Sequence, residues 1–552
     1  MNRSDQSQPA ILRKISLWLL IAIILAGEFV PLWGLVEPVL AQENAATPSI
    51  IFSQDSAVPN RPLQLTLKST VEGGTIGYTT NGALPDANST PYTGPITLDK
   101  PTVIRAQVFK DGDPVGDVYT KSYLVISYDQ SIPVVSVVAD WGDLNTLHAF
   151  PEERGTQWER PINLEYFAPG GKIQFNVKAG IRVHGNFSRK YSPKKSYRLY
   201  FRKAYGGPGN LEYPLFPDSP VTKFDQLVLR AGFQDTFFHR GIQGLADKHL
   251  SARYINDQVV RNLHRDMGQP SAHGSWVLLY LNGEFWGLYN LTERIDDHFF
   301  RSYSDKDGDW NIISKESGWE NGVWYNREEV KAGDYAGWLE TQNWVGSADF
   351  TIPGNVGVLE NRVDLENVFS YLFLQAYVQN LDWPDSNWTI YRRMDPGAKA
   401  NEGKWRMIVW DAEMTLGSVD GGFKNDINTI ERAYSPHDSI TRILEKSFIG
   451  SCYMKVRFWE RSREYLGVEN THNRPANEVG QLSKERVKAE ILKQAEIVRP
   501  FIDMEAQRWA PDMGVANFDH SVQQALKFAD ERQDVVLHHL DVMRNQMFTS
   551  CK

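Results

Sequence analysis

The sequence predicts an α+β protein with two lobes, a β-rich lobe followed by a helical lobe, and a small all-β sandwich in front of them. Three observations support this fold class. Residues 49–126 contain short strand patterns and no helical period. Strand patterns then continue to residue 291, and helical periodicity dominates after Ser439. Strands first and helices later is the order expected of an α+β unit.

The first 41 residues have the pattern of a signal peptide. A basic start precedes an apolar run at residues 15–26, and residues 39–41 (VLA) offer a cleavage site with small side chains. We expect residues 1–41 to be removed and residues 42–48 to form a linker. The protein is then secreted or extracytoplasmic, and the cell surface is one such location. It contacts a membrane only if the signal peptide is uncleaved.

Residues 49–126 are predicted to form the small β-sandwich. Leu63, Leu65 and Leu67 alternate with polar residues, as in a strand with one buried face. Asn81-Gly82 is a strong signal for a tight hairpin. We expect this domain to fold separately from the remainder, residues 131–552.

The larger remainder changes from strand to helix patterns along its length. Strands are predicted at 133–139, 173–184, 195–201, 388–392 and 405–410, with a hairpin over 277–291 around Asn282-Gly283. Helices are predicted over 240–263 and 365–378 and near 482–509 and 519–548.

Composition excludes several classes of protein. A net charge of −9 argues against nucleic-acid binding, which needs a basic face. The motifs of P-loop, dinucleotide-binding, zincin and α/β-hydrolase proteins are absent from the sequence. The only two cysteines, Cys452 and Cys551, lie far apart in sequence, and we expect both to be free thiols.

One stretch carries residues suited to phosphoryl transfer. The apolar helix predicted over 365–378 leads to Asp382 and Asn387, and the strand that ends at Trp410 is followed by Asp411. Asp-x₄-Asn after a helix, with a later Asp after a hairpin, resembles the catalytic loop and metal ligand of protein kinases. Hard oxygen ligands of this kind suit Mg²⁺ or Mn²⁺. Alone, the spacing is also typical of loop caps and turns.

Six strings in order extend this resemblance to the whole of residues 131–552. They are 181–189 (IRVHGNFSR), 193–199 (PKKSYRL), 229–232 (LRAG) with Asp235, 281–289 (LNGEFWGLY) with Glu293, 380–382 (NLD) with Asn387, and 410–411 (WD). Together they resemble the CotH family of spore-coat-type atypical protein kinases. Residues 78–82 (YTTNG) with Pro85 and Tyr92 resemble the chitobiase/β-hexosaminidase carboxy-terminal domain, an accessory module.

The CotH resemblance implies a two-lobed kinase-like fold and transfer of the ATP γ-phosphate to Ser or Thr of secreted or coat proteins. Asp382 is then the catalytic residue, with Asn387 and Asp411 as ligands of Mg²⁺ or Mn²⁺. Partners would be proteins with Ser/Thr-rich segments. The sandwich could contact glycans or a cell surface, or it could serve as a spacer that binds no ligand.

Three further residues are assigned to ATP. If 195–201 is a strand, Lys195 shares a face with apolar Tyr197, Leu199 and Phe201, so this face should point inward. In protein kinases, an inward-pointing lysine on a strand binds the ATP phosphates. Lys194 then points to solvent. Arg189 is expected to cover the phosphates from the loop over 185–189, although this loop is equally consistent with an ordinary turn. Glu293 is expected to lie near adenine, and a salt bridge at the end of the strand is the alternative.

Two other functions are consistent with the same residues. A CotH-like fold that no longer phosphorylates could serve as a surface or matrix binding protein. A glycoside hydrolase is the third possibility, because such enzymes use paired carboxylates and residues 382, 385, 411 and 413 are acidic.

Overall fold

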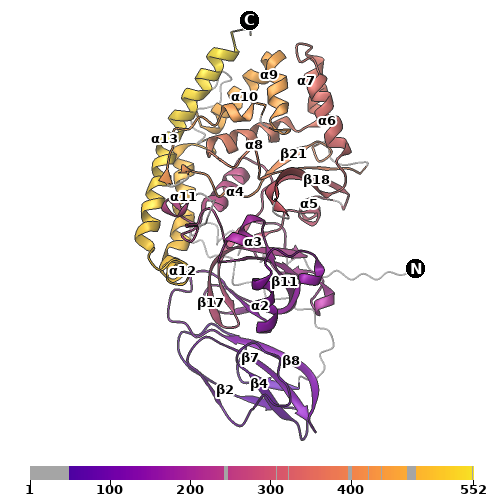
Figure 1. Cartoon of the computed structure of the whole chain (residues 1–552), viewed down its shortest axis with the longest axis vertical. Coiled ribbons are helices and arrows are strands. Elements are labelled where there is room, and N and C mark those ends of the chain that lie inside the picture. The colour runs from indigo at the N-terminus through magenta and orange to yellow at the C-terminus, as the bar shows by residue number, and fades with distance from the viewer. Residues whose placement is uncertain are drawn as a thin grey trace, which may run out of the picture. The chain divides into compact units, whose positions relative to one another are not determined.

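The computed structural model describes residues 49–241, 247–305, 307–320, 323–395, 401–419, 422–436, 438–468, 480–549 and 551. The predicted signal peptide (1–41), the predicted linker (42–48) and residues 396–400, between the strands predicted at 388–392 and 405–410, lie outside the described residues. Within these ranges the protein is α+β, as the sequence predicts, with an all-β region first and helices dominating the end (Figure 1).

The amino-terminal sandwich is built from short antiparallel strands around Leu65, Ile104 and Val108. One sheet has the order β5-β4-β7-β8, and two further pairs are β1-β3 and β2-β6. The strands are β1 (Ile50–Phe52), β2 (Leu63–Leu65), β3 (Leu67–Ser69), β4 (Thr75–Thr79), β5 (Thr90–Pro91), β6 (Ile96–Leu98), β7 (Thr102–Lys110) and β8 (Asp113–Tyr123).

The tight hairpin predicted at Asn81-Gly82 does not form. The next strand to pair with β4 is β5, which begins eleven positions after the end of β4, at Thr90, and β7 pairs with the other edge of β4. Gly82 has a positive φ of 83°, but its carbonyl accepts a hydrogen bond from Arg105 (2.8 Å) instead of starting a return strand. Pro85 in the following segment has no N–H for a strand ladder, which explains why pairing resumes later.

Seven strands then close into a barrel with the order β10-β11-β12-β15-β17-β16-β9. Its interior is filled by alternate apolar side chains such as Val137, Leu199 and Leu229. The hairpin predicted around Asn282-Gly283 is present, since both residues have positive φ and join β16 to β17. The barrel strands are β9 (Val134–Val138), β10 (Arg160–Phe167), β11 (Ile173–His184), β12 (Ser196–Tyr200), β15 (Gln226–Arg230), β16 (Gly274–Leu281) and β17 (Glu284–Glu293).

Short elements connect the barrel strands, and a second sheet follows with the order β19-β18-β20-β21. The connecting elements are α2 (Trp141–Ala149), α3 (Phe187–Tyr191), β13 (Leu211–Glu212) and β14 (Lys223–Phe224). The later strands are β18 (Trp310–Glu320), β19 (Val323–Ala332), β20 (Trp388–Arg393), β21 (Arg406–Val409), β22 (Ser418–Val419) and β23 (Gly422–Phe423).

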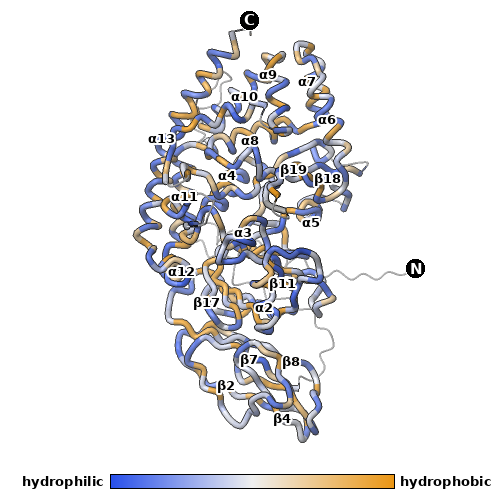
Figure 2. Tube along the Cα trace, viewed as in Figure 1, coloured by the Kyte–Doolittle hydropathy of each residue, from blue (hydrophilic) through white to orange (hydrophobic). Residues whose placement is uncertain are grey.

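The helical part is centred on α8, whose residues are nearly all buried. Helices α11 and α13 pack side by side and carry mixed polar and apolar residues (Figures 1 and 2). In the described ranges, no helix combines the length and apolar character needed to cross a bilayer. The helices are α4 (Asn256–Asp266), α5 (Asp297–Ser302), α6 (Ala336–Ser347), α7 (Gly354–Arg362), α8 (Leu365–Tyr377), α9 (Arg442–Gly450), α10 (Cys452–Tyr465), α11 (Lys484–Val498), α12 (Ile502–Trp509) and α13 (Val515–Met547).

The helix predicted over 240–263 is wrong for the described residues before Asn256. Helix α4 begins only at Asn256, because Tyr254 has a positive φ of 67° that a right-handed helix cannot contain. The carboxylate of Asp235 fixes this start by accepting bonds from the backbone N–H groups of Arg253 (2.8 Å) and Asn256 (2.9 Å).

A buried ion pair joins the barrel to the helical part. Lys194, expected to face solvent, has no exposed side-chain surface and bonds Glu505 of α12 at 2.6 Å. The other carboxylate oxygen of Glu505 accepts from the N–H of Leu288 in β17 (2.8 Å). The prediction for Lys194 is wrong because α12, 311 residues away, covers that side of the chain.

The expectation of free thiols is also wrong. Cys452, at the start of α10, forms a disulfide with Cys551, with 5.4 Å between the Cα atoms. Helix α13 packs against α10, so the end of the chain lies beside a residue 99 positions earlier. Sequence separation gave no sign of this return.

The sandwich and the barrel share a junction with a buried carboxyl group. Glu165 of β10 is fully buried and accepts hydrogen bonds from Ser56 and from Asn176 (2.9 Å). Ser122 of β8 bonds Ser136 of β9 at 2.8 Å. The chain from Ser49 onward forms one compact unit, so the predicted domain boundary between 126 and 131 lies inside it.

This junction should make stability depend on pH. Burial raises the pKa of Glu165 from 4.5 to about 7, so the folded protein holds a proton that the unfolded chain releases. The free energy of unfolding should therefore fall by about 3 kcal/mol as pH rises from 4.5 to 7. Urea unfolding across this range should show the decline in the wild type and a flatter profile in Glu165→Gln. Identical pH profiles for the two proteins would contradict this explanation.

Candidate active site

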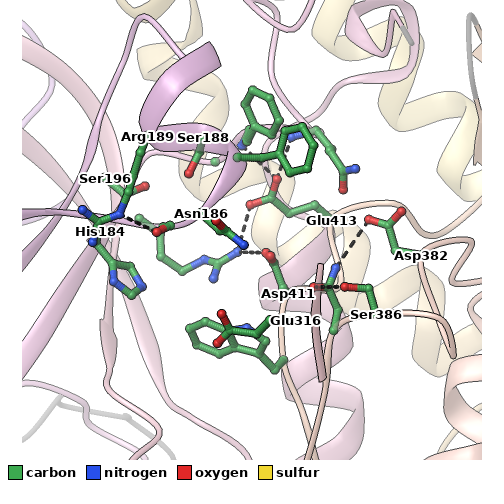
Figure 3. Close-up of a pocket in the computed structure, with 18 of the residues that line it drawn as sticks. His184, Asn186, Ser188, Arg189, Ser196, Glu316, Asp382, Ser386, Asp411 and Glu413 are labelled. Carbon is green, nitrogen blue, oxygen red and sulfur yellow. Dashed lines mark hydrogen bonds and ion pairs between the residues drawn. The ribbon is translucent and has the colours of Figure 1, made fainter. Parts of the chain in front are cut away.

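A cavity of about 470 Å³ lies between the barrel and the segments around α8 and β21. The described residues that line it include eight Arg or Lys and four Asp or Glu. Figure 3 shows Asp382 and Ser386 on one side of the cavity and His184 and Ser196 on the other. A cavity with such an excess of cations in a chain of net charge −9 is suited to a polyanionic ligand.

Asp382 and Asn387 come from one loop that follows α8. The Ser386 N–H donates to the Asp382 carbonyl (3.0 Å), which folds the loop back. The Asn387 amide then donates to Oδ2 of Asp382 at 3.4 Å. Asn387 has a φ of 58°, a left-handed conformation that occurs more often at functional sites than elsewhere.

Asp411 enters the cavity from a different direction, two residues after the end of β21. Its φ is 55°, also left-handed. Its side chain is 38% exposed, and its negative charge helps to raise the pKa of Asp382 after the larger effect of burial. Two carboxylates that share a cavity in this way can bind a cation or hold a proton.

Arg230, at the end of barrel strand β15, connects these acidic groups. One nitrogen, Nη2, donates to Asp411 (2.6 Å) and to Glu413 (2.8 Å), while Nε lies 3.5 Å from Asp257 of α4. Burial lowers the pKa of Arg230, but these three carboxylates outweigh burial and raise it. The guanidinium is therefore permanently charged and ties the barrel to α4 and to the segment after β21.

The segment after Arg230 supports the same side of the cavity. The N–H groups of Phe233 and Gln234 donate to Oε2 of Glu413 at 2.8 and 2.7 Å. Gly232 makes this turn with a φ of 74°. Burial and the charge of Asp411 raise the pKa of Glu413 to about 7. The Gln234 side chain in turn lowers the pKa of Asp382, so one turn contacts both acidic loops.

The barrel side of the cavity is lined by arginines that sequence reasoning missed. Arg182 of β11, Arg198 of β12 and Arg294 after β17 all line it. His184 is buried among them, and burial together with the Arg198 charge keeps its pKa well below the ordinary value. Its neutral ring accepts from Arg198 at 3.4 Å. The only signal was strand alternation, which places 196 and 198 on the face opposite Lys195.

Lys195 lies outside the residues that line the cavity. Its ammonium group donates to the carbonyls of Arg189 (2.7 Å) and Ser192 (2.5 Å). The face that it shares with Tyr197 and Leu199 does point inward, but inward is the apolar interior of the closed barrel. Arg198, on the opposite face of the strand, lines the cavity, whereas Lys195 does not.

Glu293 and Arg189 have structural partners. Glu293 is buried outside the cavity lining and accepts from His273 N–H (2.7 Å) and Tyr303 (2.8 Å). Arg189 does line the cavity, yet its guanidinium donates to the carbonyls of Pro151 (3.1 Å) and Glu153 (3.0 Å). Burial lowers the pKa of Arg189 to about 9. Of the predicted residues, the structure brings together Asp382, Asn387, Asp411 and Arg189.

The donor set in the cavity fits a hard divalent cation. Asp382 and Asp411 provide carboxylates and Asn387 an amide oxygen, the ligand types that Mg²⁺ and Mn²⁺ prefer. The described ranges hold no cluster of three or more His, Cys, Asp or Glu side chains arranged for a metal. A cation held by Asn387 and Asp411 would keep coordination positions for a ligand such as phosphate, because Mg²⁺ prefers octahedral coordination by oxygen.

Comparison with known families gives two matches. The model of the CotH kinase protein family matches residues 181–536. The model of the chitobiase/beta-hexosaminidase C-terminal domain matches residues 56–120, which confirms the resemblance of the sandwich. No curated protein matches the chain.

The arginines on the barrel side of the cavity, Arg182, Arg198 and Arg294, form an arginine wall whose contact with nucleotide can be tested directly. Arg198→Met should weaken binding of ATP by about 10- to 100-fold, because a charged hydrogen bond to phosphate is lost. Lys195→Met should change it by less than about 3-fold, since the Lys195 ammonium group bonds the carbonyls of Arg189 and Ser192 and does not line the cavity. Calorimetric titration with ATP and Mg²⁺ measures both. The reverse ranking would restore the assignment of Lys195 to the phosphates.

Proposed function

Since the chain belongs to the CotH kinase protein family, we propose that it transfers the γ-phosphoryl group of ATP to Ser or Thr hydroxyls of exported proteins. One observation carries this proposal. Asp382, Asn387 and Asp411, from segments on either side of β20 and β21, meet in a cavity whose opposite wall is rich in arginine. Carboxylates beside a cationic wall match the needs of phosphoryl transfer.

The arginines supply charge for the triphosphate. Arg182, Arg198 and Arg294 lie on one wall and can donate to phosphate oxygens, and Arg side chains favour phosphate because their donors are paired and fixed in one plane. Arg294 stays protonated at neutral pH, although burial lowers its pKa to about 10. The wall therefore binds and orients the triphosphate while the carboxylates face its reacting end.

Asn387 and Asp411 would hold Mg²⁺ or Mn²⁺, which, when bound, neutralises charge on the phosphate oxygens. Arg230 fixes the position of Asp411 through its 2.6 Å bond, and Asn387 is fixed by the loop around it. Both ligands are thus oriented by the fold before any nucleotide is bound.

Asp382 is suited to orient the substrate hydroxyl. It is partly buried at the mouth of the loop after α8, and burial raises its pKa. A carboxylate so placed accepts the hydroxyl proton as the oxygen attacks the γ-phosphorus. The N–H···O bond from Asn387 keeps its Oδ2 oxygen in a fixed direction.

The disulfide supports action outside the cytoplasm. Disulfides persist in oxidising compartments and are rare in the cytosol, and both cysteines of this chain are paired. The polypeptide substrate is accordingly sought among exported or coat proteins. A non-catalytic binding protein on the same fold is the outcome if no phosphate is transferred.

Substitutions of the two acidic residues should separate chemistry from binding. Asp382→Asn should leave ATP affinity nearly unchanged and lower turnover by about 10²- to 10⁴-fold, because the proton acceptor is lost. Asp411→Ala should also weaken metal-dependent ATP binding. Asp385→Asn is the matched control, since Asp385 lies in the same loop but is exposed and outside the cavity lining.

The measurement is transfer of ³²P from γ-labelled ATP to an exported protein fraction with Mg²⁺ or Mn²⁺. Wild type and Asp385→Asn should label, and Asp382→Asn should not. Wild-type labelling that survives both Asp382→Asn and Asp411→Ala would refute the site. If the wild type never labels, the binding-protein alternative takes its place, and a parallel chitooligosaccharide assay tests hydrolysis.

A further inference from the structure

Lys248 is a buried cation on the carboxylate side of the cavity. Lys248 is only 4% exposed, yet it lines the cavity together with Asp382 and Met414. It comes from the segment that leads to α4, far in sequence from the loop after α8. None of the sequence motifs includes it.

The backbone around Lys248 is fixed to the catalytic segments. Its N–H donates to the His239 carbonyl (3.1 Å), and its carbonyl accepts from the N–H of Ser251 (3.1 Å). Ser251 bonds Ser418 at 2.7 Å, just beyond the acidic segment 411–413.

Further bonds carry this connection to the loop of Asp382. Arg253 donates to the carbonyls of Thr415 (3.2 Å) and Leu416 (3.1 Å). The N–H of Leu381, the residue before Asp382, donates to the Met414 carbonyl (3.2 Å). Lys248 and Asp382 are therefore held by the same short segment, residues 414–418.

The charges of the two side chains act on one another. Burial lowers the pKa of Lys248 and Asp382 opposes that effect, while the positive charge of Lys248 lowers the pKa of Asp382. Lys248 thus lines the same part of the cavity as the residue that the proposed function assigns to the substrate hydroxyl. The arginine wall of the barrel lies on the other side of the cavity.

We propose that Lys248 is a catalytic residue that contacts the γ-phosphoryl group, an inference that rests on the proposed function. The substrate oxygen forms a bond to the γ-phosphorus as the bond to the leaving oxygen of ADP breaks, and the hydroxyl proton passes to Asp382. The Lys248 ammonium group offsets the charge on the transferred group, as preorganised cations do in such transition states.

This role predicts selectivity between ATP and ADP. In the full mature chain, Lys248→Met should weaken binding of ATP with Mg²⁺ by about 10-fold or more, and leave ADP binding within about 2-fold, because ADP has no γ-phosphate. Turnover should fall at least 100-fold, since a cation in the transition state is lost. Lys248→Arg should restore part of both, and Lys527→Met, an exposed lysine of α13, controls for the loss of charge.

Calorimetric titrations with ATP and with ADP give the binding ratio without any need for turnover, and labelled transfer gives the rate. Equal loss of ATP and ADP affinity in a folded Lys248→Met protein would overturn the proposal, as would unchanged affinities and turnover. If the wild type transfers nothing but Lys248→Met still loses ATP affinity without losing ADP affinity, the proposed function fails while the contact of Lys248 with the γ-phosphate stands.

Discussion

The bonds of Arg230 to three carboxylates are the interaction on which the site depends. Its guanidinium reaches Asp257 of α4 and both acidic residues after β21, and so connects the barrel to the helical part. Removing a buried ion-pair partner costs about 3–5 kcal/mol, because the remaining charges stay buried and unpaired. Without Arg230, Asp411 would lose its orientation and Glu413 would lose its countercharge, although strands β15 and β21 could still form.

This connection explains how one cavity holds two opposed sets of charges. The barrel provides rigid strands that carry Arg182 and Arg198, and the loops around α8 and β21 provide carboxylates. Without Arg230 between them, the carboxylates would repel one another. The arginines would also repel one another if no carboxylates lay near them. The fold keeps each set on its own element and leaves the space between them for a ligand that satisfies both.

Most local features of the site were predictable from the sequence, although the Asn81-Gly82 hairpin and the start of α4 were not, and the non-local contacts were not predictable. Asp382, Asn387 and Asp411 follow a helix and a strand with clear periodicity, and six strings in order resembled one family. Lys195 was assigned to the phosphates because the alternation of side chains along one strand separates its two faces but does not show which face lines the cavity. Lys194 and the Cys452–Cys551 bond depend on helices hundreds or tens of residues away, which no local pattern reports.

On the proposed function, this cavity binds a nucleoside triphosphate with its metal at Asn387 and Asp411. A crystal structure of the mature chain with Mn²⁺ and a non-hydrolysable ATP analogue would locate both, because Mn²⁺ gives an anomalous signal. We expect that peak beside the Asn387 and Asp411 oxygens, with the phosphates against Arg198. An analogue bound elsewhere, or a manganese peak away from both side chains, would contradict the account.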